Sequence, residues 1–163
     1  MKFTPLSPQK GVRVEGLDTS KPIDAATALE LKSELHRHRI LLVRDGPMTE
    51  VAQVAIMQSL GNVIVESLQD GGFASYVSAD PNDNAVVVGG TCRLLFHADG
   101  QITKYGALEA ISLHSIEMER SEPTIFADVV RAARVLPAQL RARIEGRDVV
   151  QCIDFSRTEE SKR

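Results

Sequence analysis

The sequence predicts a mainly β fold with flanking helices (α+β), and three observations support this. The 163 residues are 43% hydrophobic and 25% charged, as in an ordinary globular domain. Helical periodicity is concentrated near the N-terminus, whereas residues 63–119 contain short apolar runs between turn residues. We therefore expect one domain over residues 1–155, followed by a polar tail at 156–163.

The N-terminal elements are predicted from local patterns. Residues 12–16 alternate apolar and charged side chains, which is typical of a half-buried strand. Asp24 is a suitable N-cap for a helix that runs to about Leu35. Residues 40–43 form a short apolar run and are expected to be a buried strand. A second helix is expected from Thr49 to Leu60, with Gly61 as its C-cap.

The second half is predicted to hold shorter elements. Strands are expected at 74–78 and 85–88, and the turn-forming residues 80–84 between them favour a hairpin. Another apolar strand is expected at 110–118. Helical sequence should follow residues 124–127 and continue to Val135, and Pro137 is suited to the first position of a further helix. A last strand is predicted at 148–153.

Composition argues against several classes of function. The formal charge of −3 does not favour a nucleic-acid binder, which usually has a basic surplus. No apolar run is long enough to cross a membrane, and residues 1–10 lack the apolar stretch of a signal peptide. We therefore expect a cytoplasmic location. Cys92 and Cys152 match no metal-ligand spacing and are expected to be free thiols.

His97 and Asp99 are candidate metal ligands. They lie two residues apart after an apolar run, and on an extended strand such residues point to the same face. Two histidines and one carboxylate form the facial triad of non-haem Fe(II) enzymes, so this pair would supply two of three ligands. The pair alone is a weak signal, because chance produces roughly 0.25 such pairs in a chain of this composition. A histidine hydrogen-bonded to an aspartate at a strand end is the alternative interpretation.

The surrounding sequence closely resembles the TauD/TfdA family of Fe(II)/2-oxoglutarate-dependent dioxygenases. The resemblance is carried by Phe96-His97-Ala98-Asp99-Gly100, Ile111-Ser112-Leu113-His114-Ser115-Ile116-Glu117, Pro123-Thr124-Ile125-Phe126-Ala127-Asp128, Leu136-Pro137 and Arg143-Ile144-Glu145-Gly146, and by 16–18, 38–45 and 60–61 nearer the N-terminus.

This resemblance implies a double-stranded β-helix, or jelly roll, and a reaction in which 2-oxoglutarate is decarboxylated while a small organic substrate is hydroxylated. His97 and Asp99 would be the first two iron ligands. Thr124 lies where the family has a threonine that holds 2-oxoglutarate, which suits a hydroxyl that can donate to a carboxylate. Without the family match, Thr124 would be read as an ordinary strand threonine.

The chain departs from the family pattern after residue 155. The family's second histidine ligand and the arginine that pairs with 2-oxoglutarate lie farther downstream, so we expect neither here, nor the closing strands of the jelly roll. His36 and His38 fit surface or packing roles better than metal binding. His114 is a minor candidate for a replacement ligand, and Arg93 and Arg131 are only guesses for the 2-oxoglutarate arginine.

Three functions remain open from the sequence. The chain could be a dioxygenase whose remaining site residues come from a second chain, a partner protomer or a further portion of the same protein. It could be an inactive, truncated relative that acts as a binding or interaction module. It could also bind a metal for other chemistry through His97, Asp99 and waters. A homo-oligomer or a partner that completes the fold is expected, because an incomplete sheet exposes unpaired edges.

Overall fold

The computed structural model describes residues 1–44, 46–64, 72–78, 86–87, 96–99, 108–117 and 123–148. The chain divides into two compact units. The first comprises Met1–Val88 together with Ser112–His114, and the second comprises Gly89–Ile111 together with Ser115–Arg163. The expected tail at 156–163 and the free thiols at Cys92 and Cys152 fall outside the described residues.

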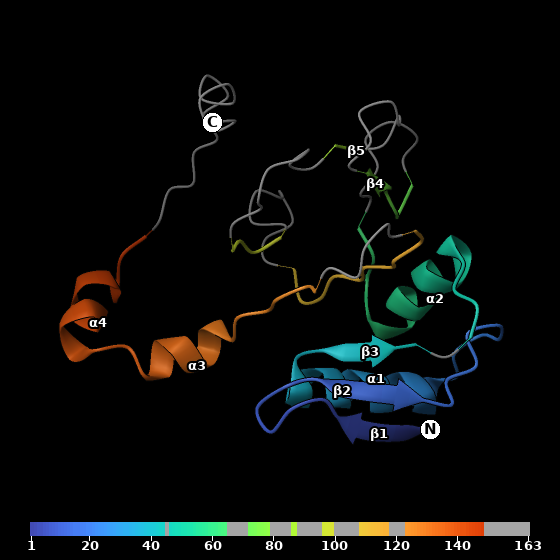
Figure 1. The fold of residues 1–163 in the computed structure, drawn as a ribbon, viewed down its shortest axis with the longest axis horizontal. Coiled ribbons are helices and arrows are strands. Elements are labelled where there is room, and N and C mark those ends of the chain that lie inside the picture. Colours follow the sequence, from blue (N-terminus) through green and yellow to red (C-terminus); the bar gives the residue numbers. More distant parts are fainter. Residues whose placement is uncertain are drawn as a thin grey trace. The chain divides into compact units, whose positions relative to one another are not determined.

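The first unit is built on a three-stranded mixed sheet, seen in Figure 1. Strand β1 (Lys2–Pro5) pairs antiparallel with β2 (Val12–Glu15), which pairs parallel with β3 (Leu41–Val43). A parallel pair needs a crossover connection, and helix α1 (Ala25–His38) supplies it. The strands predicted at 12–16 and 40–43 are therefore present.

The core of the first unit lies between this sheet and α1. Val12 and Val14 alternate with partly buried neighbours along β2, so both point to the same buried face. Val14 packs with Leu17 and with Leu31 of α1, and the surrounding partly buried apolar side chains are Phe3, Ile23, Leu41, Val43, Ile56 and Leu60. Burial of each such large apolar side chain contributes about 1.5–3 kcal/mol.

Helix α1 begins where its sequence predicts and runs to His38, past the expected end near Leu35. The Asp24 carboxylate accepts a hydrogen bond from the Thr27 backbone N–H at 2.9 Å, which confirms the predicted N-cap. The helix ends at Arg39, whose φ of 68° places it in the left-handed region. The Arg39 N–H donates to the Leu35 carbonyl at 2.7 Å and closes the last turn.

Helix α2 (Glu50–Leu60) has its predicted limits as well. The Thr49 hydroxyl accepts from the Ala52 N–H at 3.1 Å, and the Gly61 N–H donates to the Met57 carbonyl at 3.1 Å. The ammonium of Lys32 on α1 donates to the Leu60 carbonyl at 3.1 Å. This bond joins the end of α2 to α1 and satisfies a carbonyl that the helix itself leaves unpaired.

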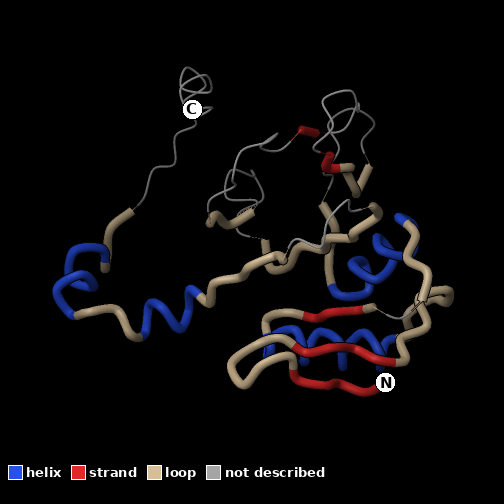
Figure 2. Tube along the Cα trace, in the orientation of Figure 1, coloured by secondary structure: helices blue, strands red, loops and turns tan. Residues whose placement is uncertain are grey.

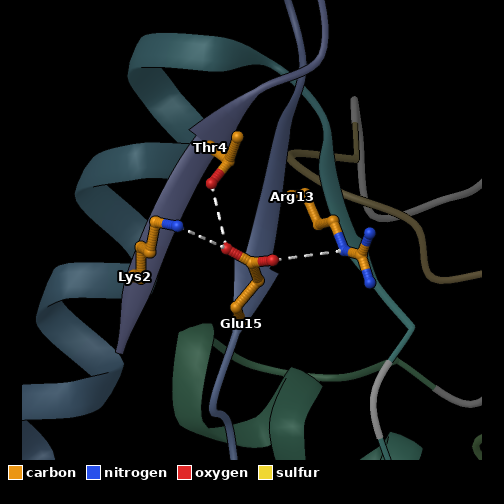
Figure 3. A network of polar contacts seen from close by, with 4 residues as sticks. All are labelled: Lys2, Thr4, Arg13 and Glu15. Carbon is orange, nitrogen blue, oxygen red and sulfur yellow. Dashed lines mark hydrogen bonds and ion pairs between the residues drawn. The ribbon is translucent and has the colours of Figure 1, made fainter.

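A polar network crosses β1 and β2, as Figure 3 shows. Glu15 accepts a hydrogen bond from the Thr4 hydroxyl at 3.0 Å and lies 3.4 Å from the Lys2 ammonium and 3.9 Å from Arg13 Nε. The Thr4 hydrogen bond and then Lys2 lower the pKa of Glu15 below its ordinary value. The network fixes the register of an edge strand that the sequence pattern did not predict.

The predicted hairpin is wrong. Strand β4 (Val77–Ser78) and strand β5 (Val86–Val87) form a two-stranded sheet, but they pair parallel. Turn-forming residues indicate that the chain changes direction. An antiparallel pair needs one reversal, whereas a parallel pair needs a connection that returns the chain to the end at which the first strand began. The turn chemistry of residues 80–84 does not distinguish these two outcomes.

The strand predicted at 110–118 is also not observed over residues 110–117, which are assigned to no helix or strand. An apolar run becomes a strand only when a neighbouring strand accepts its backbone hydrogen bonds, and residues 111–117 are exposed. The strand predicted at 148–153 falls outside the described residues except for Asp148.

Among its described residues, the second unit contains two short helices. Helix α3 (Val129–Arg134) begins after Asp128, whose carboxylate accepts from the Arg131 N–H at 2.9 Å. Helix α4 (Ala138–Ile144) follows Pro137, which occupies the cap position rather than the predicted first helical position. The Arg141 guanidinium donates to the carbonyls of Ala133 and Arg134 at 2.6 and 3.2 Å, so α4 caps the end of α3.

Together, the described elements are one mixed sheet with the helices α1 and α2, one short parallel pair of strands, and the helices α3 and α4, consistent with the predicted α+β class (Figure 2). The described residues do not themselves include a jelly roll. None of the helices among them has the length and apolar character needed to span a membrane.

Candidate metal centre

The two residues predicted to bind metal lie close together. His97 Nε2 and Asp99 Oδ1 are 3.1 Å apart, and their side chains are 49% and 53% exposed. Residues 96–99 form no strand; the chain bends at Phe96 and turns at Asp99. The side chains therefore meet across a bend rather than on one face of an extended strand. The predicted juxtaposition is present, but its backbone geometry differs from the one expected.

The spacing of the pair fits two neighbouring ligands of one metal ion. An ion that binds an imidazole nitrogen and a carboxylate oxygen at about 2.1 Å, with bonds at right angles, requires these atoms about 3.0 Å apart. Nitrogen and oxygen donors of this kind are the ones that ferrous iron uses in facial-triad sites. The same distance also suits a direct hydrogen bond between the two side chains.

Within the described ranges, no cluster of three or more His, Cys, Asp or Glu side chains could hold a metal ion. His114 lies exposed in residues 112–114 of the first unit, whereas His97 and Asp99 belong to the second. His36 is exposed on α1. His38 Nε2 lies 3.2 Å from Glu34 Oε2, one helical turn earlier, which gives this histidine a partner within α1.

Among the described residues, no contact brings Thr124 or Arg131, which were considered for binding 2-oxoglutarate, to the metal pair. Thr124 is exposed in residues 123–127, an unassigned segment that leads to α3, and it makes no polar contact with His97 or Asp99. Arg131 is exposed on α3, where its backbone is capped by Asp128. Arg93 lies outside the described residues.

A long-range contact between α2 and Ser112 is among those that sequence reasoning missed. The Gln53 side-chain amide on α2 donates to the Ser112 carbonyl at 3.2 Å and to the Ser112 hydroxyl at 3.0 Å. The two residues are 59 positions apart in the sequence. No local pattern could have indicated this contact, because a glutamine on a helix and a serine in an apolar run are both unremarkable by themselves.

Comparison with known proteins gives a broad match to a family and a partial match to a solved structure. The sequence matches the family described as "Taurine catabolism dioxygenase TauD, TfdA family" over residues 2–163. No curated protein matches the chain significantly. The crystal structure of AAD-2 in complex with Mn(II) and N-oxalylglycine is similar at 26% identity and a TM-score of 0.37, over 38% of this chain and 25% of that one.

The match to the solved structure thus spans only a quarter of the length of AAD-2. The family match, in contrast, includes both candidate ligands, Thr124 and all the described helices and strands. Because it extends over almost the whole sequence, the chain belongs to the TauD/TfdA family, the family of taurine catabolism dioxygenases.

Proposed function

We propose that this chain is part of an Fe(II)- and 2-oxoglutarate-dependent dioxygenase that hydroxylates a small organic substrate, with His97 and Asp99 as two iron ligands. The observation that carries this proposal is the 3.1 Å spacing of the two donor atoms in a chain of the TauD/TfdA family. Both side chains are about half exposed, so an ion can reach them from solvent.

The chain's own residues would bind and orient the reactants. His97 would provide a neutral nitrogen ligand, and Asp99 would provide an anionic oxygen that offsets part of the charge of the ion. Thr124 would donate its hydroxyl hydrogen to a carboxylate of 2-oxoglutarate. When bound, the iron supplies the oxygen chemistry that couples decarboxylation of 2-oxoglutarate to hydroxylation of a C–H bond.

We further propose that the complete site is a jelly roll and contains groups beyond these three residues. A third iron ligand and an arginine for 2-oxoglutarate would come from a second protomer, a partner chain or a further portion of the same protein, in the cytoplasm. A charge-assisted hydrogen bond to such an arginine contributes about 1.5–3 kcal/mol. Adding the arginine would therefore raise the affinity for 2-oxoglutarate about tenfold or more.

The test is an anaerobic titration of the whole chain with Fe(II) and 2-oxoglutarate, followed through the visible metal-to-ligand charge-transfer band. We expect a band that saturates at one iron per site. His97→Ala and Asp99→Ala should each abolish it, because each removes a ligand. His36→Ala is the matched control, since it removes an exposed histidine from α1 and should leave the band unchanged.

A chain that retains no iron and develops no band would contradict the proposal. That result would favour an inactive relative that acts as a binding or interaction module. The next experiment would then be to identify its partner. A band that persists in both ligand variants would instead place the iron on other residues.

A further inference from the structure

Helix α4 has a mainly apolar side that the described residues leave uncovered. Leu140, Arg143 and Ile144 are three to four positions apart, so they lie on the same side of the helix, and all three are exposed. Together with Leu136, in the turn before the helix, they line a hollow of about 370 Å³. We call these four residues the α4 stripe. Apolar side chains at this spacing form the side that a helix normally buries.

The stripe belongs to a pair of helices that is held together by its own hydrogen bonds. The Arg141 guanidinium on α4 donates to the carbonyls of Ala133 and Arg134 at the end of α3. Figure 1 shows the two helices as consecutive elements of the second unit. These bonds fix the arrangement of α3 and α4 without using any residue of the α4 stripe, so the stripe is available to another molecule.

The charge around the α4 stripe is positive, although the chain as a whole is acidic. Residues 123–148 contain five arginines and three acidic residues, whereas the whole chain has a formal charge of −3. Among the described residues, none forms an ion pair or a hydrogen bond with the guanidinium groups of Arg131, Arg134 and Arg143. Covering Arg143 with apolar atoms alone would cost free energy, because a buried charge needs a partner. A molecule that covers the stripe should therefore carry an anion beside its apolar groups.

We propose that the α4 stripe is a docking site for an acidic amphipathic helix of a partner protein. An apolar side chain of that helix would fill the hollow, and a glutamate or aspartate three or four positions away would pair with Arg143. A second copy of the chain would bring the same arginines towards one another, and like charges weaken such a contact. A lipid surface would supply anions, but it has no side chain to fill the hollow.

The first experiment measures binding of a synthetic helical peptide to the whole, metal-free chain by fluorescence anisotropy. The peptide carries leucines on one side and glutamates on the other. We expect saturable binding that weakens about tenfold when glutamine replaces every glutamate, because the charge pairs are lost. Equal binding of the two peptides would overturn the charge complementarity, and no binding of the acidic peptide would overturn the site. Iron is absent, so neither result depends on the proposed function.

Variants of the stripe separate its charge from its apolar contact. Arg143→Gln should weaken binding of the acidic peptide about two- to tenfold and leave that of the glutamine peptide unchanged. Ile144→Ser should weaken binding of both peptides about tenfold, since both use the apolar contact. Arg37→Gln is the matched control, because it changes an exposed arginine of α1 and should leave both affinities unchanged. Equal effects of Arg143→Gln and Arg37→Gln would overturn the role of Arg143.

Two further measurements address the other occupants. We expect the chain to co-sediment with phosphatidylserine vesicles no more than with phosphatidylcholine vesicles. Binding to the phosphatidylserine vesicles that Arg143→Gln and Ile144→Ser abolish would assign the stripe to a lipid surface and overturn the proposal. In sedimentation velocity, the acidic peptide should dissociate any oligomer that forms through the stripe. An oligomer that persists with the peptide but is lost in Ile144→Ser would mean that a second copy fills the stripe, which would also overturn the proposal.

Discussion

Asp18 organises the loop that follows β2 through several short contacts. Its carboxylate accepts hydrogen bonds from the Ser20 N–H at 3.1 Å and the Ser20 hydroxyl at 2.5 Å, and its second oxygen lies 2.6 Å from the Lys21 ammonium. The hydrogen bond from Lys21, followed by those from Ser20, lowers the pKa of Asp18 to about 2. The same contact raises the pKa of Lys21.

The sign of the resulting pH dependence follows from this shift. The folded chain holds the Asp18 carboxyl in its charged form more strongly than the unfolded chain does, so its contribution to stability is present above the ordinary pKa of 3.8. The contribution is lost as the pH falls from about 3.8 towards 2. The carboxylate is exposed, so salt weakens its pairing with Lys21.

We predict that Lys21→Ala raises the pKa of Asp18 towards 3.8, because it removes the largest cause of the shift. Carboxyl-carbon NMR titration measures this directly. Lys2→Ala is the matched control: it should raise the pKa of Glu15, which Lys2 lowers, and leave that of Asp18 unchanged. An Asp18 pKa that is the same with and without Lys21 would show that the ion pair is absent in solution.

Residue by residue, the sequence predicts local features of the site and misses distant ones. His97 and Asp99 are two positions apart, so their proximity needs no knowledge of the fold. The sequence could not show that they meet at a bend, because the apolar run before them favours a strand. The contact between Gln53 and Ser112 depends entirely on how distant segments fold together, and it leaves no local pattern.

Among the elements, α1 carries much of the stability of the first unit through a single buried position. Leu31 is 1% exposed and packs against Val14 and Leu17, whereas Leu29 on the same helix is 71% exposed. We predict that Leu31→Ala lowers the free energy of unfolding by about 2–5 kcal/mol, since it removes buried methyl groups and leaves a cavity.

Leu29→Ala is the matched control, because it makes the same chemical change in the same helix. It should alter the free energy of unfolding by no more than about 0.5 kcal/mol. Urea unfolding followed by circular dichroism compares the two variants under identical conditions. Similar losses in both would mean that α1 does not pack against the sheet as described.

Elements whose limits depend on local chemistry are predicted well. Asp24 and Thr49 cap the helices that follow them, since a side-chain oxygen next to free N–H groups is enough to start a helix. Strand β1 was missed because Lys2 and Pro5 obscure its pattern, and both are typical of an edge strand. Strands β4 and β5 were mispaired, because two-residue strands have little sequence preference for either direction.

At the scale of the whole molecule, helices α3 and α4 expose several large apolar side chains. Val135 between them is 72% exposed and Ile144 is 61% exposed, and both lie close to the arginines of these helices. Leu136, Leu140, Arg143 and Ile144 line a hollow of about 370 Å³. Apolar patches of this kind often mark contacts between proteins.

We predict that the chain self-associates at micromolar concentration and that Val135→Lys with Ile144→Lys reduces the association. If a second copy of the chain covers the exposed apolar side chains at Val135 and Ile144, the two lysine ammonium groups would be buried there without partners. Sedimentation velocity measures the distribution of species. Val51→Lys is the control, because Val51 is 79% exposed on α2 and lies outside this patch. A stable monomer of the unmodified chain at this concentration would contradict the prediction.

The position of the core along the sequence has a consequence for biosynthesis. The buried side chains of the described residues are Val12, Val14, Leu17, Thr19 and Leu31, and the sheet of the first unit is complete at Val43. The ribosome makes this part of the chain before it reaches His97, so the sheet and α1 can fold while translation continues. The candidate ligands at positions 97 and 99 would then be synthesised after the sheet and α1 have folded.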